Sequence, residues 1–365
     1  MSVVASRKAE EQRVTLQSIA DRLGVSRTTV SNAYSRPDQL NPKLRERILE
    51  TADELGYCGP DPAARTLRSG HAGVVGVLLA ERLSYAFTDP AAVRFLQGVA
   101  QVGEREGTGL LLLPPSSPDG AGPPAGAVLG AVVDGFLVYS MSSDAPGVQS
   151  VVARRLPTVV VDEPRLPGAS FVGIDDRAGA RSVAEHVLGL GHERIAVITF
   201  RLAADSYDGP VTPERQAAAT FTISRARLEG YADAVRAAGL RWEDVEIQER
   251  MLNSVAGGMD AARVLLASDP RPTAILATSD VLAIGAMRAA RELGLAVPDD
   301  LSVSGFDDTP DAVLVTPALT TVRQPLLDKG AVAGRLLLDP SPGRGAEEIL
   351  LPTQLAVRAS TGPPP

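Results

Sequence analysis

Four polar side chains near the start of the chain have the types and the spacing of a base-reading surface. They fall on one side of a helix predicted to begin after Ser26: Arg27, Thr28, Thr29 and Asn32. Arginine can donate two hydrogen bonds to guanine, and asparagine can pair with adenine in the same bidentate way. The chemistry that these residue types favour is recognition of DNA. A small helical bundle with a polar solvent face is the alternative that the pattern leaves open.

Three short helices are predicted to hold these side chains. Apolar residues recur at helical spacing between positions 16 and 23, and Thr15 can cap that helix. Gly24 follows it, where a left-handed turn costs glycine least. The second helix ends before Pro37, and a third runs from about 41 to 56. Three short helices with a tight turn between the first two form a helix-turn-helix.

The rest of the chain alternates predicted strands and helices. The expected strands cover residues 73–79, 108–114, 135–140, 158–162, 171–175, 194–200, 273–279 and 301–308. The expected helices include 89–106, 176–190, 224–238 and 280–293, and we expect long loops at 114–126 and 201–224. This alternation predicts parallel sheets covered by helices, in two successive α/β units.

Polar residues end several of these strands. They are Tyr139, Ser140, Asp162, Ser279, Asp280, Asp307 and Asp308. Ligands of open α/β folds bind at the carboxyl ends of the strands, so a site between two lobes is one interpretation. The other is that Asp and Ser at strand ends cap the next helix. The segment after the first strand could also bring Tyr85, Phe87 and Asp89 to the rim of such a site.

Composition and charge exclude several classes of protein. The chain has 365 residues, a formal net charge of −8 and 44% apolar residues, which indicates a globular chain of more than one domain. Residues 1–70 carry 11 Lys and Arg against 9 Asp and Glu, whereas the whole chain has 36 against 44. Neither a signal peptide nor an apolar run long enough for a membrane span is predicted. With the single cysteine Cys58, a reducing cytoplasm is the expected location.

Enzymatic and metal-binding motifs are missing from the sequence. It has no phosphate-binding P-loop, no G-x-S-x-G elbow and no CxxC pair. His71, His186 and His192 lack metal-ligand spacing. We therefore expect no metal, no cofactor and no enzymatic activity. A solute receptor or an enzyme of sugar metabolism with an accessory helix-turn-helix are the alternatives, but the first needs a secretion signal and the second a catalytic group.

A specific resemblance adds to this interpretation. The segment VTLQSIADRLGVSRTTVSNAYSRPDQLNPKLRERILETADELGY resembles the DNA-binding head of the lactose-repressor (LacI/GalR) family of bacterial transcription regulators. The segment PDPAARTLRSG is similar to that family's hinge helix, whereas its composition alone fits a plain linker. The resemblance implies a repressor that binds a near-palindromic double-stranded DNA operator as a homodimer. The implied DNA contacts are Thr15, Arg22, Ser26, Arg27, Thr28, Thr29, Ser31, Asn32, Lys43, Ala64 and Leu67, with Leu67 as a minor-groove wedge.

The resemblance extends over most of the chain. The segments SRARLEGYADAVRAAGL, TAILATSDVLAIGAMRAARELGLAVPDDLSVSGFDD and PALTTVRQP look like the family's effector-binding core, which is similar to periplasmic sugar-binding proteins. It implies effector contacts at Asp162, Arg227, Ser279 and Asp307, with Tyr139 nearby. Several carboxylates with one arginine suit a small neutral polyol such as a sugar.

The expected organisation is an all-α head joined to a two-lobed α/β core. We place the helix-turn-helix domain at residues 1–58, the hinge at 59–70 and the core at 71–365. Within the core, we expect one lobe from 71–163 plus a C-terminal return, and a second from 164–310. A ligand-responsive transcription regulator explains both parts, which neither alternative does.

Overall fold

The computed structural model describes residues 14–59, 70–115, 122–339 and 345–365. The chain divides into two compact units, Met1–Ala72 and Gly73–Pro365, here called the head and the core. Among the described residues, no helix is long and apolar enough to cross a membrane.

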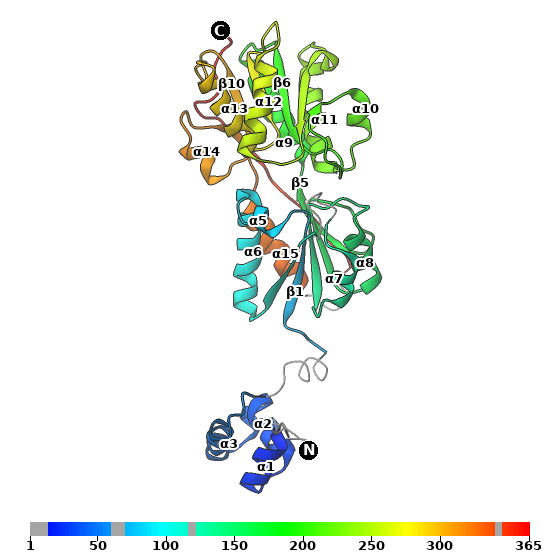
Figure 1. Ribbon diagram of the computed structural model, residues 1–365, viewed down its shortest axis with the longest axis vertical. Helices are drawn as coiled ribbons and strands as arrows, with labels where there is room; N and C mark the ends of the chain where they lie inside the picture. The colour runs from blue at the N-terminus through cyan, green and yellow to red at the C-terminus, as the bar shows by residue number, and fades with distance from the viewer. Residues whose placement is uncertain (1–13, 60–69, 116–121, 340–344) are drawn as a thin grey trace, which may run out of the picture. The chain divides into compact units, whose positions relative to one another are not determined.

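The described part of the head consists of helices around a small apolar core (Figure 1). They are α1 (Leu16–Leu23), α2 (Arg27–Ser35), the short 3-10 helix η1 (Pro37–Gln39) and α3 (Pro42–Glu54). Gly24 ends α1 with a φ of 68°, a left-handed conformation that glycine adopts without a steric penalty. Ile19, Val30 and Ile48, one from each α-helix, are fully buried against one another. This confirms the predicted helix-turn-helix.

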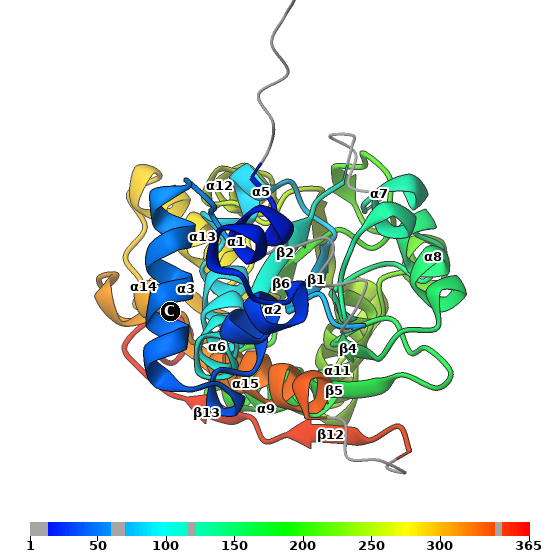
Figure 2. The same cartoon turned by 90° about the horizontal axis from the view of Figure 1, so that it is seen from below.

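The first lobe of the core contains a sheet of the order β12-β5-β4-β3-β1-β2. Its strands are β1 (Val74–Leu79), β2 (Gly109–Leu113), β3 (Gly135–Tyr139), β4 (Thr158–Val161), β5 (Ser170–Ile174) and β12 (Glu348–Leu351), all paired in parallel. Its helices are α5 (Leu83–Ala86), α6 (Pro90–Glu106), α7 (Ala125–Gly130), α8 (Pro146–Arg154) and α15 (Leu326–Leu338). Figure 2 shows α6 and α15 on one face of this sheet and α7 and α8 on the other.

The second lobe contains a sheet of the order β13-β11-β10-β9-β6-β8-β7. Its strands are β6 (Ile195–Phe200), β7 (Gly209–Pro210), β8 (Glu246–Arg250), β9 (Ala274–Ala277), β10 (Ser302–Asp307), β11 (Thr320–Arg323) and β13 (Gln354–Ala356). Its helices are α9 (Asp176–Gly189), α10 (Pro213–Ala217), α11 (Thr222–Ala237), η2 (Trp242–Asp244), α12 (Val255–Leu266), α13 (Asp280–Glu292) and α14 (Pro310–Leu314). Helices α9 and α11 pack on one face and α12 and α13 on the other, so the central strands are buried on both sides.

The chain passes between the lobes where β5 leads into α9, where β11 leads into α15 and where β12 leads into β13. The first lobe therefore extends beyond the boundary expected at 163/164. Strand β5 pairs with β4 and belongs to the first sheet. The apolar pattern identified this strand, but it carries no information about which sheet the strand joins.

Several elements of the second lobe were not predicted, among them the strand β8 and the helix α12. Strand β8 has the polar sequence EIQER, yet Glu249 is fully buried because Arg215 pairs with it. Helix α12 has two adjacent glycines, Gly257 and Gly258, in its first turn. A Cβ on Gly258 would lie 2.3 Å from the carbonyl oxygen of Leu282, so glycine here permits close packing of α12 against α13. The loop expected at 201–224 also contains β7 and α10.

Candidate functional site

The recognition surface of the head is built by helix caps. The Thr15 hydroxyl accepts a hydrogen bond from the Ser18 amide, and the Ser18 hydroxyl accepts one from the Thr15 amide, so α1 begins with a reciprocal cap. The Ser26 hydroxyl accepts from the Thr29 amide at 3.0 Å and starts α2. The Asn41 side chain caps α3 through the Lys43 amide. These caps fix where each helix begins and therefore which side chains it presents.

Most of the predicted DNA-contacting residues of the head are accessible. Exposed side chains are those of Thr15, Arg22, Ser26, Arg27, Thr28 and Lys43. Thr29, Ser31 and Asn32 are half-buried rather than fully outward-facing. The Thr29 hydroxyl lies 2.8 Å from the Ser26 hydroxyl at the start of the helix. Ala64 and Leu67, the predicted hinge residues, lie outside the described residues.

A cavity of about 100 Å³ lies between the two lobes of the core. Its first-lobe wall comes from the ends of β1, β3 and β4 and from α5, and its second-lobe wall from the ends of β6 and β10 and from α11. The predicted residues that line it are Tyr85, Asp89, Tyr139, Ser140, Asp162, Arg227 and Asp307. The carboxyl ends of the strands therefore converge as the alternating pattern predicts.

Two predicted effector residues do not line this cavity. Phe87 follows α5 and is 60% exposed. Ser279 is buried and caps α13, because its hydroxyl accepts from the Leu282 amide at 3.2 Å. The same hydroxyl donates to Asn253 at 2.5 Å, and Asn253 does line the cavity. Ser279 is thus a helix cap, and it contacts the cavity only indirectly, through its hydrogen bond to Asn253.

Asp280 and Asp308, the other strand-end residues, are held by the protein itself. Asp280 accepts from the amide and hydroxyl of Thr309 and from the hydroxyl of Thr321. Asp308 pairs with Arg323 and Arg358, each at 2.5 Å. The two adjacent carboxylates at the end of β10 therefore differ. Asp307 lines the cavity, whereas Asp308 forms ion pairs with arginines of the protein.

A buried chain of polar contacts connects the cavity carboxylates. The Lys329 ammonium donates to Asp162 at 2.5 Å and to Gln324 at 2.6 Å. The Gln324 amide donates to Asp307 at 2.5 Å. Asp307 also lies 3.4 Å from the Arg227 guanidinium, which donates to Asp176 at 2.8 Å. Arg227 and Lys329, the two cations in this series of contacts, are therefore already paired with carboxylates of the protein.

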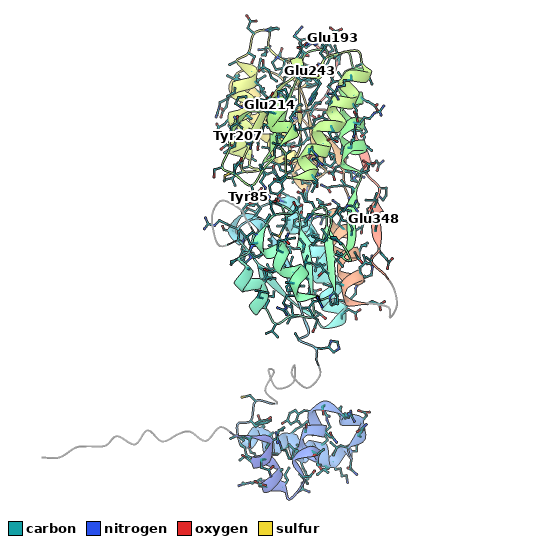
Figure 3. The ribbon with its side chains drawn as sticks, turned by 90° about the vertical axis from the view of Figure 1, so that its right-hand side faces the viewer. Tyr85, Glu193, Tyr207, Glu214, Glu243 and Glu348 are labelled. Atoms are coloured by element: carbon teal, nitrogen blue, oxygen red, sulfur yellow. The ribbon has the colours of Figure 1, made fainter. Side chains whose placement is uncertain are left out.

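Three further contacts cross directly from one lobe to the other. The Tyr85 hydroxyl donates to the carbonyl oxygen of Asn253 at 2.6 Å. Glu163, which follows β4, accepts from the Thr222 amide at 2.5 Å and so caps α11 of the second lobe. Glu81 forms an ion pair with Arg201. Figure 3 shows Tyr85 at the level where the two lobes meet.

Burial governs the protonation of the cavity carboxyls. Removal from water raises the pKa of Asp89 to about 6 and the pKa values of Glu163 and Asp307 to about 7. Arg227 acts in the opposite direction on the pKa of Asp307. A ligand that donates hydrogen bonds to these groups would favour their ionised forms.

Several residues of the cavity were not predicted from the sequence. They are Glu81, Glu163, Arg201, Asn253 and Gln324, together with the supporting Asp176 and Lys329. Glu81 and Arg201 each follow directly on or shortly after a predicted strand, and this position could have identified them. Lys329 carries no such signal, since a lysine on a helix is usually exposed.

Together, the helix-turn-helix head and the two-lobed core with a cavity at its strand ends define a DNA-binding regulator with a periplasmic-binding-protein-like core. Residues 15–59 match the family described as "Bacterial regulatory proteins, lacI family", and residues 184–361 match "Periplasmic binding protein-like domain".

Relatives and solved structures agree with these matches. The chain is 48% identical to an HTH-type transcriptional regulator of Mycobacterium tuberculosis, over 97% of this chain and 98% of the relative. A LacI-family regulator from Corynebacterium glutamicum is similar in structure, with a TM-score of 0.71 and 36% identity over 97% of this chain and 99% of that one. The complex of the regulator CelR with cellobiose has a TM-score of 0.69 and 28% identity, covering 95% and 100%. The chain therefore belongs to the lacI family of bacterial regulatory proteins, and it is a transcriptional regulator.

Proposed function

We propose that this regulator is a repressor that binds a near-palindromic operator as a homodimer and responds to a small, neutral, hydroxyl-rich effector. The effector binds in the cavity between the lobes and changes the affinity of the protein for the operator. The observation that carries the proposal is the series of hydrogen bonds, through Lys329 and Gln324, that joins Asp162 of the first lobe to Asp307 of the second at this cavity.

The exposed face of α2 supports the assignment of base reading. Arg27 and Thr28 are exposed at the N-terminal end of this helix, where helix-turn-helix proteins contact base edges in the major groove. Arg22 and Lys43, exposed near helix ends, are suited to phosphate contacts. One head covers a small footprint, which favours two symmetric heads on two half-sites.

The lining of the cavity supports a neutral ligand. Asp89, Asp162, Glu163 and Asp307 offer acceptor oxygens, whereas Arg201 and Arg227 are paired with carboxylates of the protein. An anionic ligand would face several carboxylates, and the described lining residues offer it no unpaired cation; burial of unpaired charge is costly. A polyol supplies the hydroxyl donors that these oxygens accept. The bound cellobiose of the similar regulator CelR also supports a carbohydrate.

The size of the cavity supports a small ligand. A cavity of about 100 Å³ favours a small ligand over a large one. We infer that the lobes adjust when a sugar ring enters. Such a movement is the change that could be transmitted to the head.

The proposal is tested by selecting bound DNA from a random pool with the full-length protein. We expect enrichment of one near-palindromic sequence, and loss or gain of binding to it when the correct neutral sugar or polyol is added. D-ribose and cellobiose are the first ligands of the panel, followed by other monosaccharides, cyclitols and disaccharides. Enrichment of no sequence would contradict operator binding. An enriched operator whose binding responds to anionic metabolites and not to neutral ones would contradict the effector class.

A further inference from the structure

Lys329 is a buried lysine, and lysine side chains are seldom buried in proteins. It lies on α15 of the first lobe with 1% of its surface exposed. Its ammonium donates to Asp162 Oδ1 at 2.5 Å and to Gln324 Oε1 at 2.6 Å. A buried ammonium is tolerated only when it is paired and hydrogen-bonded, so these two contacts account for its presence.

Gln324 extends the contact of this ammonium into the second lobe. It lies on the crossover between β11 and α15, and its amide donates to Asp307 Oδ1 at 2.5 Å. Asp162 follows β4 of the first lobe, whereas Asp307 ends β10 of the second. One ammonium and one amide thus connect a cavity carboxylate of each lobe, across the segment about which the lobes must turn.

The positive charge of Lys329 affects the repulsion between the carboxylates of the cavity. Asp89 of the first lobe faces Asp307 closely enough to raise the pKa of Asp307, beyond the larger effect of burial. Lys329 acts in the opposite direction on the pKa values of both Asp307 and Asp176. The positive charge of Lys329 therefore offsets repulsion between carboxylates that belong to different lobes.

We propose that Lys329 is a positioning residue of the interlobe cavity, which holds Asp162 directly and Asp307 through Gln324, and thereby sets the angle between the lobes. The consequence for effector response rests on the function proposed above. The positioning itself does not, because it concerns the protein without DNA and without effector. Replacement of the ammonium by an apolar group leaves the carboxylates without this counter-charge, so the lobes separate and vary more in angle.

The test is a distance measurement between spin labels on the two lobes. Glu104→Cys on α6 and Glu243→Cys on η2 provide exposed labelling positions in full-length protein that carries Cys58→Ser. Figure 3 shows Glu243 on the second lobe, away from Tyr85 at the junction. Dilution with unlabelled protein removes distances between subunits. We expect Lys329→Met to shift the interlobe distance distribution to longer values and to broaden it.

Two variants separate positioning from general loosening. Glu249→Gln removes a buried charge that pairs with Arg215 within the second lobe, and it should leave the interlobe distances unchanged. Asp162→Asn combined with Lys329→Met removes both charges of the pair and should restore part of the original distribution. An unchanged distribution in Lys329→Met overturns the proposal, as does equal broadening in Glu249→Gln.

Gln324→Met provides the decisive variant if Lys329→Met does not fold. It leaves the pair of Lys329 with Asp162 in place and removes the connection to Asp307. The proposal predicts a longer and broader interlobe distribution for this variant. A distribution equal to that of the unchanged protein would overturn it. Neither measurement uses DNA or a ligand, so failure here is distinct from failure of the proposed repressor function.

Discussion

The hydroxyl of Tyr85 in the first lobe donates a 2.6 Å hydrogen bond to the carbonyl oxygen of Asn253 in the second lobe. Asn253 in turn accepts from Ser279, the cap of α13, so the contact connects α5 to the framework of the second lobe. The chain of contacts through Lys329 joins the lobes at the crossovers, and the Tyr85 contact joins them at another point of the cavity wall. Separation of the lobes by a ligand must break the Tyr85 contact, whereas the crossovers stay covalently connected.

Base reading by α2 predicts a sequence-dependent loss of DNA binding. Arg27→Ala or Asn32→Ala should cost about 1–3 kcal/mol at the cognate operator and relax specificity at one base position, because a bidentate contact is lost. Anisotropy titrations against the operator and its single-base variants measure both effects.

Arg22→Ala is the matched control for this prediction. A phosphate contact carries no sequence information, so its loss should weaken binding uniformly and reduce the salt slope by about 1. Equal losses on operator and random DNA for Arg27→Ala would remove this residue from the base-reading set.

The cap of α2 predicts a local loss of stability. Ser26→Ala removes the acceptor of the Thr29 amide and should destabilise the head by about 1 kcal/mol. Amide hydrogen exchange at the start of α2 measures this change. Ser35→Ala is the comparison, because its hydroxyl donates to the carbonyl of Ser31 and caps nothing, so its effect should stay within about 0.5 kcal/mol. Equal effects of the two substitutions would show that the cap contributes no stability.

The hinge predicted from the sequence makes DNA bending depend on Leu67. A leucine inserted into a central base step costs a few kcal/mol of unstacking, which the contacts of the bent duplex offset. Leu67→Ala should therefore weaken specific binding and reduce the bend angle, measured by energy transfer between dyes at the DNA ends. A bend angle that does not change would rule out the wedge.

Glu163 predicts a particular dependence of stability on pH. Burial raises its pKa from 4.5 to about 7 in the folded protein. Between these two values the folded state binds more protons than the unfolded state, so this group makes stability fall as the pH rises from about 4.5 to about 7, by at most about 1.4 kcal/mol per pH unit. Glu163→Gln should remove this share of the slope.

Chemical unfolding followed by the fluorescence of Trp242, the single tryptophan, measures that slope in the core. Glu243→Gln, at an exposed position, should leave the slope as it is. The same slope in Glu163→Gln as in the unchanged protein would show that Glu163 does not titrate in this range.

The head could be predicted from the sequence because its signals are local. Thr15, Gly24 and Ser26 each act within four residues of the chain, through a cap or a turn. The alternation of strands and helices also predicted the α/β core, since buried parallel strands are continuous apolar runs. What could not be predicted was the sheet that β5 joins, which depends on pairing and not on pattern.

Part of the cavity could be predicted because some of its residues stand at the ends of predicted strands. Asp162 and Asp307 end strands, a position that the sequence reveals. Lys329 contacts Asp162 across a sequence separation of 167, and nothing in the sequence around either residue indicates the other. Ser279 also ends a predicted strand, but it caps α13 and does not line the cavity. A strand-end position alone does not distinguish a helix cap from a ligand contact.

The central claim is that a ligand between the lobes controls operator binding. The most direct test is the operator affinity of Asp307→Ala, measured with and without the neutral ligand to which the unchanged protein responds. An effector that changes operator affinity tenfold represents a coupling of about 1.4 kcal/mol, and DNA must change effector affinity by the same factor. Asp308→Asn, one residue away and outside the cavity lining, is the control and should keep the response. We predict that Asp307→Ala loses the response to the ligand, whereas a full response in Asp307→Ala would contradict this location of the site.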